Sequence, residues 1–310
     1  MIGETIGRYR ILRKLGAGGM GEVYLAEDRE LDRQVALKFL SPHLSGDHEG
    51  TLRFEREARA AASLDHPNIV TVYEVGAHEG RAFIAMAYVP GQSLAEAILG
   101  GELSTDQALD ITLQICAGLS RAHQAGIVHR DIKPGNVAVG EDGHVRILDF
   151  GLAKQAELTM VTQQDATVGT PRYMSPEQAR GAAVDARTAL FSVGAMLYEM
   201  ITGRRAFDGE HAAGIHHAIA SIDPPPLARF ASGVEPEVER IVRKLLAKDP
   251  DLRYQTAADV MAEARGLEIP AALRSRVEAG DLGRKSGNGF YRYDAKGKPD
   301  GGKVTMAPEQ

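Results

Sequence analysis

The 310-residue sequence has little cysteine, no long apolar run and no excess of positive charge. Its single cysteine, Cys116, excludes an intrachain disulfide and a zinc site built on several cysteines, and it fits a reducing compartment. We expect Cys116 to fill space in the core. No run approaches the roughly 18 consecutive apolar residues of a membrane span. Because the N-terminus also lacks the basic and apolar regions of a secretion signal, we expect a cytoplasmic protein without a membrane span.

The charge balance argues against one class of partner. The chain carries 36 Lys and Arg against 42 Asp and Glu, a net charge of −6, which gives no reason to expect nucleic-acid binding. Hydrophobic residues at 44% and charged residues at 25% are ordinary for soluble globular chains and exclude wholesale disorder. The length predicts two domains, or one domain with two lobes. Glycine is abundant, with 34 residues.

The pattern of apolar residues changes along the chain. The first ninety residues read mostly as strands, at 9–12, 23–26, 34–39, 69–75 and 81–89, with one helix at 51–64 and a turn at 76–80. Helical spacing follows at 105–125, 189–202, 236–246 and 257–266, interrupted by short strands at 137–139 and 145–148. We therefore predict an α+β fold with two lobes: a small antiparallel sheet lobe with one main helix, then a larger, mostly helical lobe.

A glycine-rich turn lies between the first two predicted strands. The turn contains four glycines. Gly16, Gly18 and Gly21 match the pattern G-x-G-x-x-G, and Gly19 lies between them. The same pattern marks dinucleotide-binding folds, but there a helix follows the last glycine, whereas here a strand continues. A strand–turn–strand hairpin lets backbone N–H groups close over phosphates, and Val23 is positioned to cover the base of a nucleotide.

A lysine interrupts the third predicted strand. Lys38 is flanked by apolar residues, and a buried ammonium group needs a partner. The following helix offers Glu55 and Glu57. The alternative is a surface lysine that extends its amine to solvent.

Two polar motifs follow in the helical part, His129 to Asn136 and Asp149 to Gly151. Their two Asp, one Asn and one Lys supply oxygen ligands for Mg²⁺, an acceptor for a hydroxyl proton and a cation for a phosphate. With the glycine turn and Lys38, these motifs identify a resemblance. From about residue 9 to 268 the chain resembles the catalytic domain of bacterial Ser/Thr protein kinases.

The resemblance implies a kinase domain at 1–268, with an N-lobe at 1–88, a hinge at 87–91 and a C-lobe at 92–268. Asp131 is then the catalytic base, and Lys133 steadies the γ-phosphate of ATP. Lys38 binds the α- and β-phosphates and pairs with Glu57, which lies ten residues before Pro67. Asn136 and Asp149 hold Mg²⁺, with Mn²⁺ as an alternative. The resemblance assigns the adenine pocket and hinge to Val23, Ala36, Met86, Tyr88 and Val89.

The kinase class and its regulation also follow from the resemblance. Lys133, two residues after Asp131, and the sequence Gly169-Thr170-Pro171 indicate the Ser/Thr class, so the expected partners are ATP and protein substrates. Glu177 is expected to form a buried pair with Arg253. The expected autophosphorylation sites, which a homodimer would modify in trans, are Thr167 first and then Thr162 and Thr159.

Position 189 departs from the family pattern. The family normally has Asp where this chain has Ala189, and that Asp accepts hydrogen bonds from backbone N–H groups of the His129–Arg130 segment. Two hypotheses stay open: an active kinase with a looser catalytic loop, and a catalytically impaired pseudokinase that acts as a nucleotide-binding scaffold.

The segment 269–310 differs from the rest of the chain. It carries eight Lys and Arg against five Asp and Glu, and it resembles the C-terminal end of 3-hydroxyacyl-CoA dehydrogenases. The nucleotide domain and catalytic histidine region of that family are missing, so we expect no dehydrogenase activity. Because segments below roughly 40 residues seldom fold alone, we interpret this tail as a fusion scar in preference to a module or an independent domain.

Overall fold

The computed structural model describes residues 1–18, 21–41, 48–101, 103–149, 171–209, 211–266, 291–293 and 299–303. The side chains of 48–51, 53, 56, 57, 291–293 and 299–303 are not described. The chain divides into two compact units, Met1–Ala262 and Glu263–Gln310. The strands β10 (Tyr291–Tyr293) and β11 (Pro299–Lys303) of the second unit form an antiparallel pair. The predicted boundary after residue 268 lies outside the described residues.

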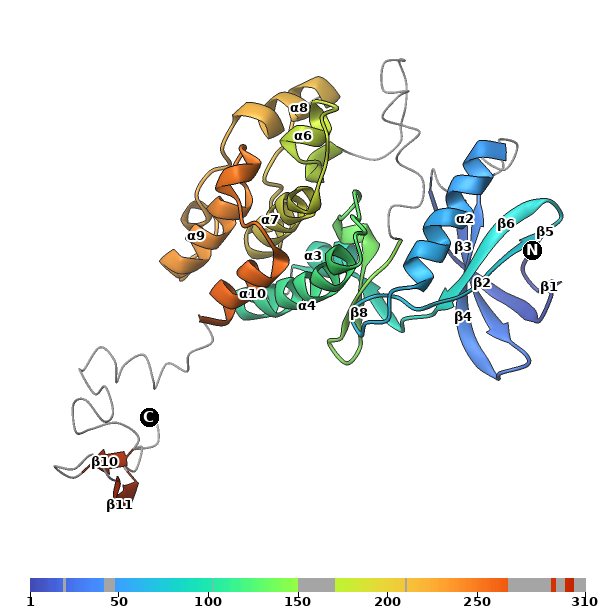
Figure 1. Ribbon diagram of the computed structural model, residues 1–310, viewed down its shortest axis with the longest axis horizontal. Helices are drawn as coiled ribbons and strands as arrows, with labels where there is room; N and C mark the ends of the chain where they lie inside the picture. The colour runs from blue at the N-terminus through green and yellow to red at the C-terminus, as the bar shows by residue number, and fades with distance from the viewer. Residues whose placement is uncertain are drawn as a thin grey trace. The chain divides into compact units, whose positions relative to one another are not determined.

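The N-terminal part of the first unit is a six-stranded antiparallel sheet in the order β1-β2-β3-β4-β6-β5 (Figure 1). Its strands are β1 (Thr5–Ile6), β2 (Tyr9–Gly18), β3 (Gly21–Asp28), β4 (Arg33–Leu40), β5 (Val72–His78) and β6 (Arg81–Ala87). The predicted sheet lobe is confirmed, and β2 is longer than the expected run at 9–12.

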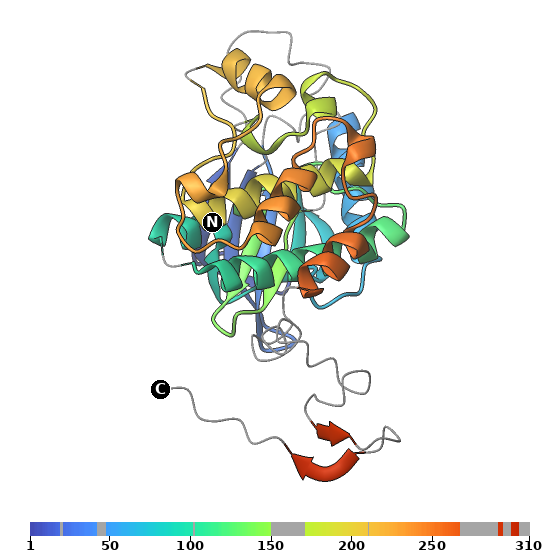
Figure 2. The ribbon, with the colours of Figure 1, turned by 90° about the vertical axis from the view of Figure 1, so that its left-hand side faces the viewer.

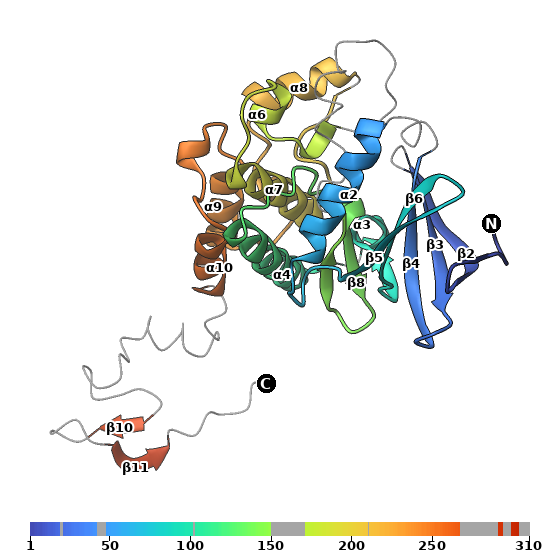
Figure 3. The same cartoon turned by 45° about the vertical axis from the view of Figure 1, so that its right-hand side comes forward.

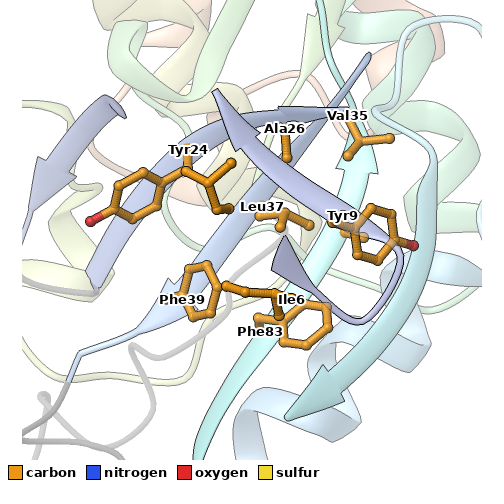
Figure 4. Packing of buried hydrophobic residues seen from close by; sticks show 10 residues of the cluster. Ile6, Tyr9, Tyr24, Ala26, Val35, Leu37, Phe39 and Phe83 are labelled. Carbon is orange, nitrogen blue, oxygen red and sulfur yellow. The ribbon is translucent and has the colours of Figure 1, made fainter. Parts of the chain in front are cut away.

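Side chains of alternate residues divide the core of this lobe between the two faces of the sheet. On one face Tyr24, Leu37, Phe39 and Phe83 are buried in one cluster (Figure 4), where the Tyr24 and Phe39 rings meet edge to face at 5.9 Å. Helix α2 (His48–Ala62) lies beside the other face (Figure 3), and its Phe54 is buried in a cluster with Leu40 and Ile84 of the sheet. This arrangement fixes β4 in the middle of the lobe, with Lys38 and Ala36 facing away from the aromatic cluster.

The rest of the first unit is mostly helical, as expected. Its α-helices are α3 (Leu94–Gly100), α4 (Thr105–Gln124), α6 (Pro176–Ala179), α7 (Ala186–Thr202), α8 (Ala212–Ser221), α9 (Pro236–Leu245) and α10 (Ala257–Arg265). Short 3₁₀ turns lie at Pro134–Asn136, Pro171–Tyr173, Leu227–Arg229 and Pro250–Leu252. Helix α7 is the centre of the lobe, because it is buried along most of its length and packs against α4 and α9 (Figure 2). Cys116 of α4 is fully buried, and burial raises the pKa of its thiol to about 12, which confirms it as a core residue.

Further details differ from the sequence-based expectations. The predicted turn at 76–80 is wrong in its first half: β5 continues to His78, and the turn uses Glu79 and Gly80, both in the left-handed region with φ of 48° and 77°. Gly76 serves packing, since a Cβ there would lie 2.6 Å from the Phe83 ring. Helix α7 begins three residues early, at Ala186, because Asp185 caps its N-terminus by accepting from the Arg187 N–H. Helices α3, α6 and α8 were not expected.

A three-stranded antiparallel sheet joins the lobes. It consists of β7 (Gly91–Ser93), β8 (Val137–Gly140) and β9 (Val145–Ile147), and it confirms the two predicted short strands. Gly91 has a φ of 136°, and a Cβ there would lie 2.2 Å from the Val139 carbonyl oxygen, so the hinge ends in a position that only glycine fits. The segments before β8 and after β9 carry both polar motifs. Within the described residues no helix is long and apolar enough to cross a membrane.

Candidate active site

A cleft of about 390 Å³ lies between the sheet lobe and the β7-β8-β9 sheet. Among the residues that line it are Gly16, Val23, Ala36, Met86, Tyr88, Val89 and Asp149, all of which the sequence predicted for the nucleotide site. Sequence reasoning missed other lining residues, namely Arg13, Leu15, Gln92, Ser93, Glu96, Gly135, Ala138 and Leu148. Leu148 directly precedes Asp149, so its position was a signal that could have found it.

The glycine hairpin joins β2 and β3 beside this cleft. Gly18 pairs with Gly21, while Gly19 lies outside the described residues. Gly21 has a φ of 139°, and a Cβ there would collide with the Phe39 carbonyl oxygen at 1.8 Å. At Gly16 and Gly18 a Cβ would meet open space within 4 Å. The glycines therefore have two uses: Gly21 permits the hairpin, and the other two leave room for a ligand.

Lys38 forms an ion pair across the cleft. Its Nζ lies 2.8 Å from Oδ2 of Asp149, and the side chain is only 5% exposed. The structure thus confirms that Lys38 is buried and paired, and it excludes the surface-lysine alternative. The predicted partner, Glu57, lies on α2, but its side chain is not among those described, so the Lys38–Glu57 pair stays a prediction. Through its ion pair with Lys38 of β4, Asp149 connects the segment after β9 to the sheet lobe.

The loop between α4 and β8 positions Asp131. Oδ2 of Asp131 accepts hydrogen bonds from Lys133 Nζ at 2.8 Å and from Asn136 Nδ2 at 3.2 Å, and Asn136 Nδ2 also donates to the Asp131 carbonyl oxygen at 2.8 Å. Asp131 is 8% exposed. The structure therefore brings together the three residues that the motif predicted, with a carboxylate oxygen held between a cation and an amide.

His129 connects this loop to the segment that bears Asp149. Its buried ring hydrogen-bonds through Nε2 to the Leu148 carbonyl oxygen at 2.9 Å, and Nδ1 faces the Asp131 N–H at 3.3 Å. A carbonyl oxygen only accepts and an N–H only donates, so Nε2 carries the proton and Nδ1 accepts. Burial lowers the pKa of His129, which keeps the ring neutral and suits both bonds. The Leu148 N–H donates to the Asn136 carbonyl oxygen at 2.8 Å, which completes the link.

Two residues of the site have a strained backbone. Arg130 and Asp149 lie in the left-handed region, with φ of 56° and 47°. This conformation costs on the order of 1–3 kcal/mol for a residue other than glycine and persists only where its surroundings impose it. Arg130 directly precedes Asp131, and Asp149 is itself a predicted metal ligand, so the contacts around both residues impose a backbone conformation that their residue types disfavour.

The predicted buried pair between Glu177 and Arg253 is present. Arg253 Nη1 and Nη2 donate to the two carboxylate oxygens of Glu177 at 2.7 and 2.8 Å, and Thr188 Oγ1 donates to the same carboxylate at 2.7 Å. Burial raises the pKa of Glu177, but the bonds from Arg253 and Thr188 outweigh burial and leave the pKa at about 2. The pair fixes the segment that follows the 150–170 stretch, which is outside the described residues.

The residues present fit a nucleoside triphosphate with a divalent cation. Asp149 and Asn136 offer hard oxygen donors, and Mg²⁺ is commonly held by one or two protein side chains together with substrate phosphates. Lys38 and Lys133 place two ammonium groups near the two carboxylates. The apolar residues Val23, Ala36 and Met86 line the part of the cleft suited to a base.

The comparisons with known proteins decide the family. The sequence model of the protein kinase domain family matches residues 9–264 of this chain. The chain belongs to the protein kinase domain family. Kinase domains in general use ATP and a divalent metal ion.

Relatives of this kinase domain include bacterial enzymes. The chain is 43% identical over 267 residues to the serine/threonine-protein kinase PrkC of Bacillus subtilis, covering 86% of this chain and 41% of the relative. It is 42% identical over 301 residues to the serine/threonine-protein kinase PknB of Mycobacterium leprae, covering 93% of this chain and 48% of the relative. The chain thus spans less than half the length of these two relatives.

The fold of the kinase domain is also that of a solved structure. The Mycobacterium tuberculosis PknI kinase domain superposes with a TM-score of 0.69 at 30% identity, covering 86% of this chain and 99% of that chain. The predicted kinase fold, with its antiparallel sheet lobe and helical lobe, is confirmed. The family model ends at residue 264, so the resemblance of the tail to 3-hydroxyacyl-CoA dehydrogenases stays a prediction.

Proposed function

We propose that the chain transfers the γ-phosphoryl group of ATP to Ser or Thr hydroxyls of protein substrates. The observation that carries the proposal is the Asp131 carboxylate, buried and hydrogen-bonded to both Lys133 and Asn136. The Ser/Thr class is supported by Lys133 and by the names of the relatives, PrkC and PknB.

The residues of the site divide the work. Asp131 orients the acceptor hydroxyl and takes its proton as the hydroxyl oxygen bonds to the γ-phosphorus and the bond to the ADP oxygen breaks. Lys38 and Lys133 supply fixed positive charge against the phosphate oxygens. When bound, ATP supplies the phosphoryl group, and Mg²⁺ held by Asn136 and Asp149 supplies further positive charge. Mn²⁺ suits the same oxygen donors.

Asp131→Asn tests the assignment. The amide cannot accept the hydroxyl proton, so we expect phosphate transfer from radiolabelled ATP to casein to fall by about 10²–10⁴-fold. Asp106→Asn, at the start of α4 and far from the loop in sequence, is the matched control and keeps full activity. Equal activity of Asp131→Asn and the unaltered chain would refute the proposed base.

A second candidate function rests on Ala189. This residue of α7 is 1% exposed and has no side-chain acceptor. If the chain is a pseudokinase that acts as a nucleotide-binding scaffold, it binds nucleotide but does not transfer the phosphoryl group. If the unaltered chain binds ATP but is silent, and Ala189→Asp restores transfer, the pseudokinase is the correct assignment.

Autophosphorylation of the 150–170 stretch belongs to the first proposal. Thr167, and then Thr162 and Thr159, lie outside the described residues, and their use in trans would require a homodimer. Phosphopeptide mapping after incubation with MgATP checks them, and an unmodified stretch in an active enzyme contradicts the expectation.

A further inference from the structure

Among the described helices of the C-lobe, α10 begins with a reciprocal capping box of Thr256 and Asp259, and three others begin with a box built on serine. In each, the N-cap serine accepts from the N–H three residues later, and the side chain of that residue accepts from the serine N–H: Ser93 with Glu96, Ser104 with Gln107, and Ser175 with Gln178. In α3 the returning side chain is a carboxylate, which shows that the box needs only an acceptor oxygen there. The amide nitrogen of a glutamine is therefore not required for the cap.

Gln178 uses its amide nitrogen elsewhere. Its Oε1 accepts from the Ser175 N–H at 3.1 Å, while its Nε2 donates to the Arg130 carbonyl oxygen at 2.8 Å. Gln178 is 7% exposed, and Ser175 is fully buried, so water competes little for either bond. One side chain thus connects the start of α6 to the residue directly before Asp131, across 48 positions of sequence.

We infer that Gln178 is a positioning residue for the catalytic loop, and that it holds Arg130 in the strained conformation that aims Asp131. Arg130 has a φ of 56°, which its own residue type disfavours, so hydrogen bonds from its surroundings are needed to maintain it: the local bond from the Asp131 N–H to the His129 carbonyl oxygen and the bond from Gln178. Gln178 donates to the Arg130 carbonyl oxygen, which belongs to the same peptide group as the Asp131 N–H.

The surroundings of Gln178 make it a rigid anchor. The neighbouring Glu177 is fixed by the fork of Arg253 and by Thr188, which lies on the first turn of α7. Ala189, the next residue of α7, has no side-chain acceptor to offer. The Glu177–Arg253 pair therefore fixes the position of α6, and the Gln178 amide connects α6 to the catalytic loop.

The experiment compares Gln178→Glu with Gln107→Glu in the full chain. Both replacements keep an acceptor for the serine N–H, but only Gln178→Glu removes a donor from the catalytic loop. We expect kcat for phosphate transfer to casein to fall roughly tenfold in Gln178→Glu, corresponding to about 1.4 kcal/mol of transition-state stabilisation, with the KM for ATP unchanged. Gln107→Glu keeps the kcat of the unaltered chain.

Hydrogen exchange gives a second readout that needs no activity. The Asp131 N–H bonds to the His129 carbonyl oxygen at 2.7 Å, and we expect the peptide that contains it to exchange faster in Gln178→Glu than in Gln107→Glu. If Gln178→Glu does not fold, Gln178→Met, which introduces no charge, takes its place in both measurements, and Gln107→Met becomes its control because methionine removes the capping acceptor in both variants.

The inference rests on the proposed kinase function for its kinetic part, and the two fail differently. An unaltered chain that transfers no phosphate refutes the proposed function, while the exchange comparison still decides the role of Gln178. An active chain in which the Gln178 variants keep kcat within twofold, or an Asp131 peptide whose exchange matches that in Gln107→Glu, overturns the inference.

Discussion

Asp131 and Asp149 are two carboxylates in one site, and their neighbours give them different properties. Asp131 lies between the ammonium group of Lys133 and the amide of Asn136, within a single loop. Asp149 instead pairs with Lys38 from the other lobe and has a left-handed backbone. The hydrogen bonds of its own loop thus fix the position of the Asp131 carboxylate. The Asp149 carboxylate is instead held by an ion pair with Lys38, which a bound nucleotide with its metal ion would replace.

The neutral state of His129 predicts a dependence of stability on pH. Burial lowers the pKa of His129 in the folded chain below the ordinary 6.5. As pH falls below 6.5, the unfolded chain binds a proton that the folded chain excludes, so stability is full above that pH and declines below it, by up to about 1.4 kcal/mol per pH unit.

Urea unfolding at pH 7.5 and 5.5 checks this prediction. In His129→Gln, the amide can still donate to the Leu148 carbonyl oxygen, but the side chain no longer titrates. We expect the loss of unfolding free energy between the two pH values to be smaller in this variant. Equal losses in the two proteins would show that the ring does not contribute.

At the scale of elements, sequence patterns predicted the long helices and most strands because their apolar residues follow one period over many positions. Short elements were missed: α3 has seven residues, and α8 contains Gly214 and two histidines of modest helix propensity. Gly76 was interpreted as a turn because the sequence does not show that the Phe83 ring lies against it.

The glycine hairpin allows a matched prediction. Gly21→Ala places a Cβ against the Phe39 carbonyl oxygen at a positive φ, so we expect it to lower the unfolding free energy by about 1–3 kcal/mol. Gly18→Ala places its Cβ in open space and is the control. Thermal unfolding of both variants measures the difference, and equal melting temperatures would contradict it.

The buried Glu177–Arg253 pair predicts a large loss of unfolding free energy when one of its two residues is replaced. Arg253→Met leaves the Glu177 carboxylate buried without its partner, which costs about 3–5 kcal/mol of unfolding free energy. Arg59→Met, which removes the exposed pair with Glu55 at 3.4 Å, costs less than about 1 kcal/mol. Denaturant titration of both variants tests the contrast.

The same pair has a pH signature. The pKa of Glu177 is about 2 in the folded chain and 4.5 in its ordinary range, so its stabilising contribution is full above pH 4.5 and is lost as pH falls toward 2. Arg253→Met should therefore lose less stability on acidification than the unaltered chain does. An identical acid transition in both would mean that the pair is not the cause.

For the whole molecule, the motifs predicted which residues would meet, but not how they are connected. Lys38, Asp131, Lys133, Asn136 and Asp149 carry recognisable spacing, and the structure brings them together. Gln178 has no such spacing, since its role depends on the fold bringing α6 to the catalytic loop. Lys38 pairs with Asp149, a contact that the sequence pattern did not predict, while the predicted pair with Glu57 stays a prediction.

The division of the chain predicts the effect of shortening it. The first unit contains every described residue of the site and the described buried residues of both lobes except Ala264. A chain shortened to residues 1–268 is expected to keep its melting temperature within about 2 °C, since a ΔΔG of 1 kcal/mol shifts a domain of this size by about 2–4 °C, and to keep full kinase activity. A loss of either would show that the tail contributes to the kinase domain.

Leu148 is held in the site by two backbone hydrogen bonds, and its side chain packs against the cluster of Ala36, Val70 and Met86. Its carbonyl oxygen accepts from His129 and its N–H donates to Asn136, while the residue lines the nucleotide cleft. A different apolar residue at this position reshapes the wall of the cleft and leaves both bonds in place. We therefore expect substitutions at position 148 to change the affinity of the cleft for a competitive nucleotide inhibitor, while the two backbone bonds that hold His129 and Asn136 remain.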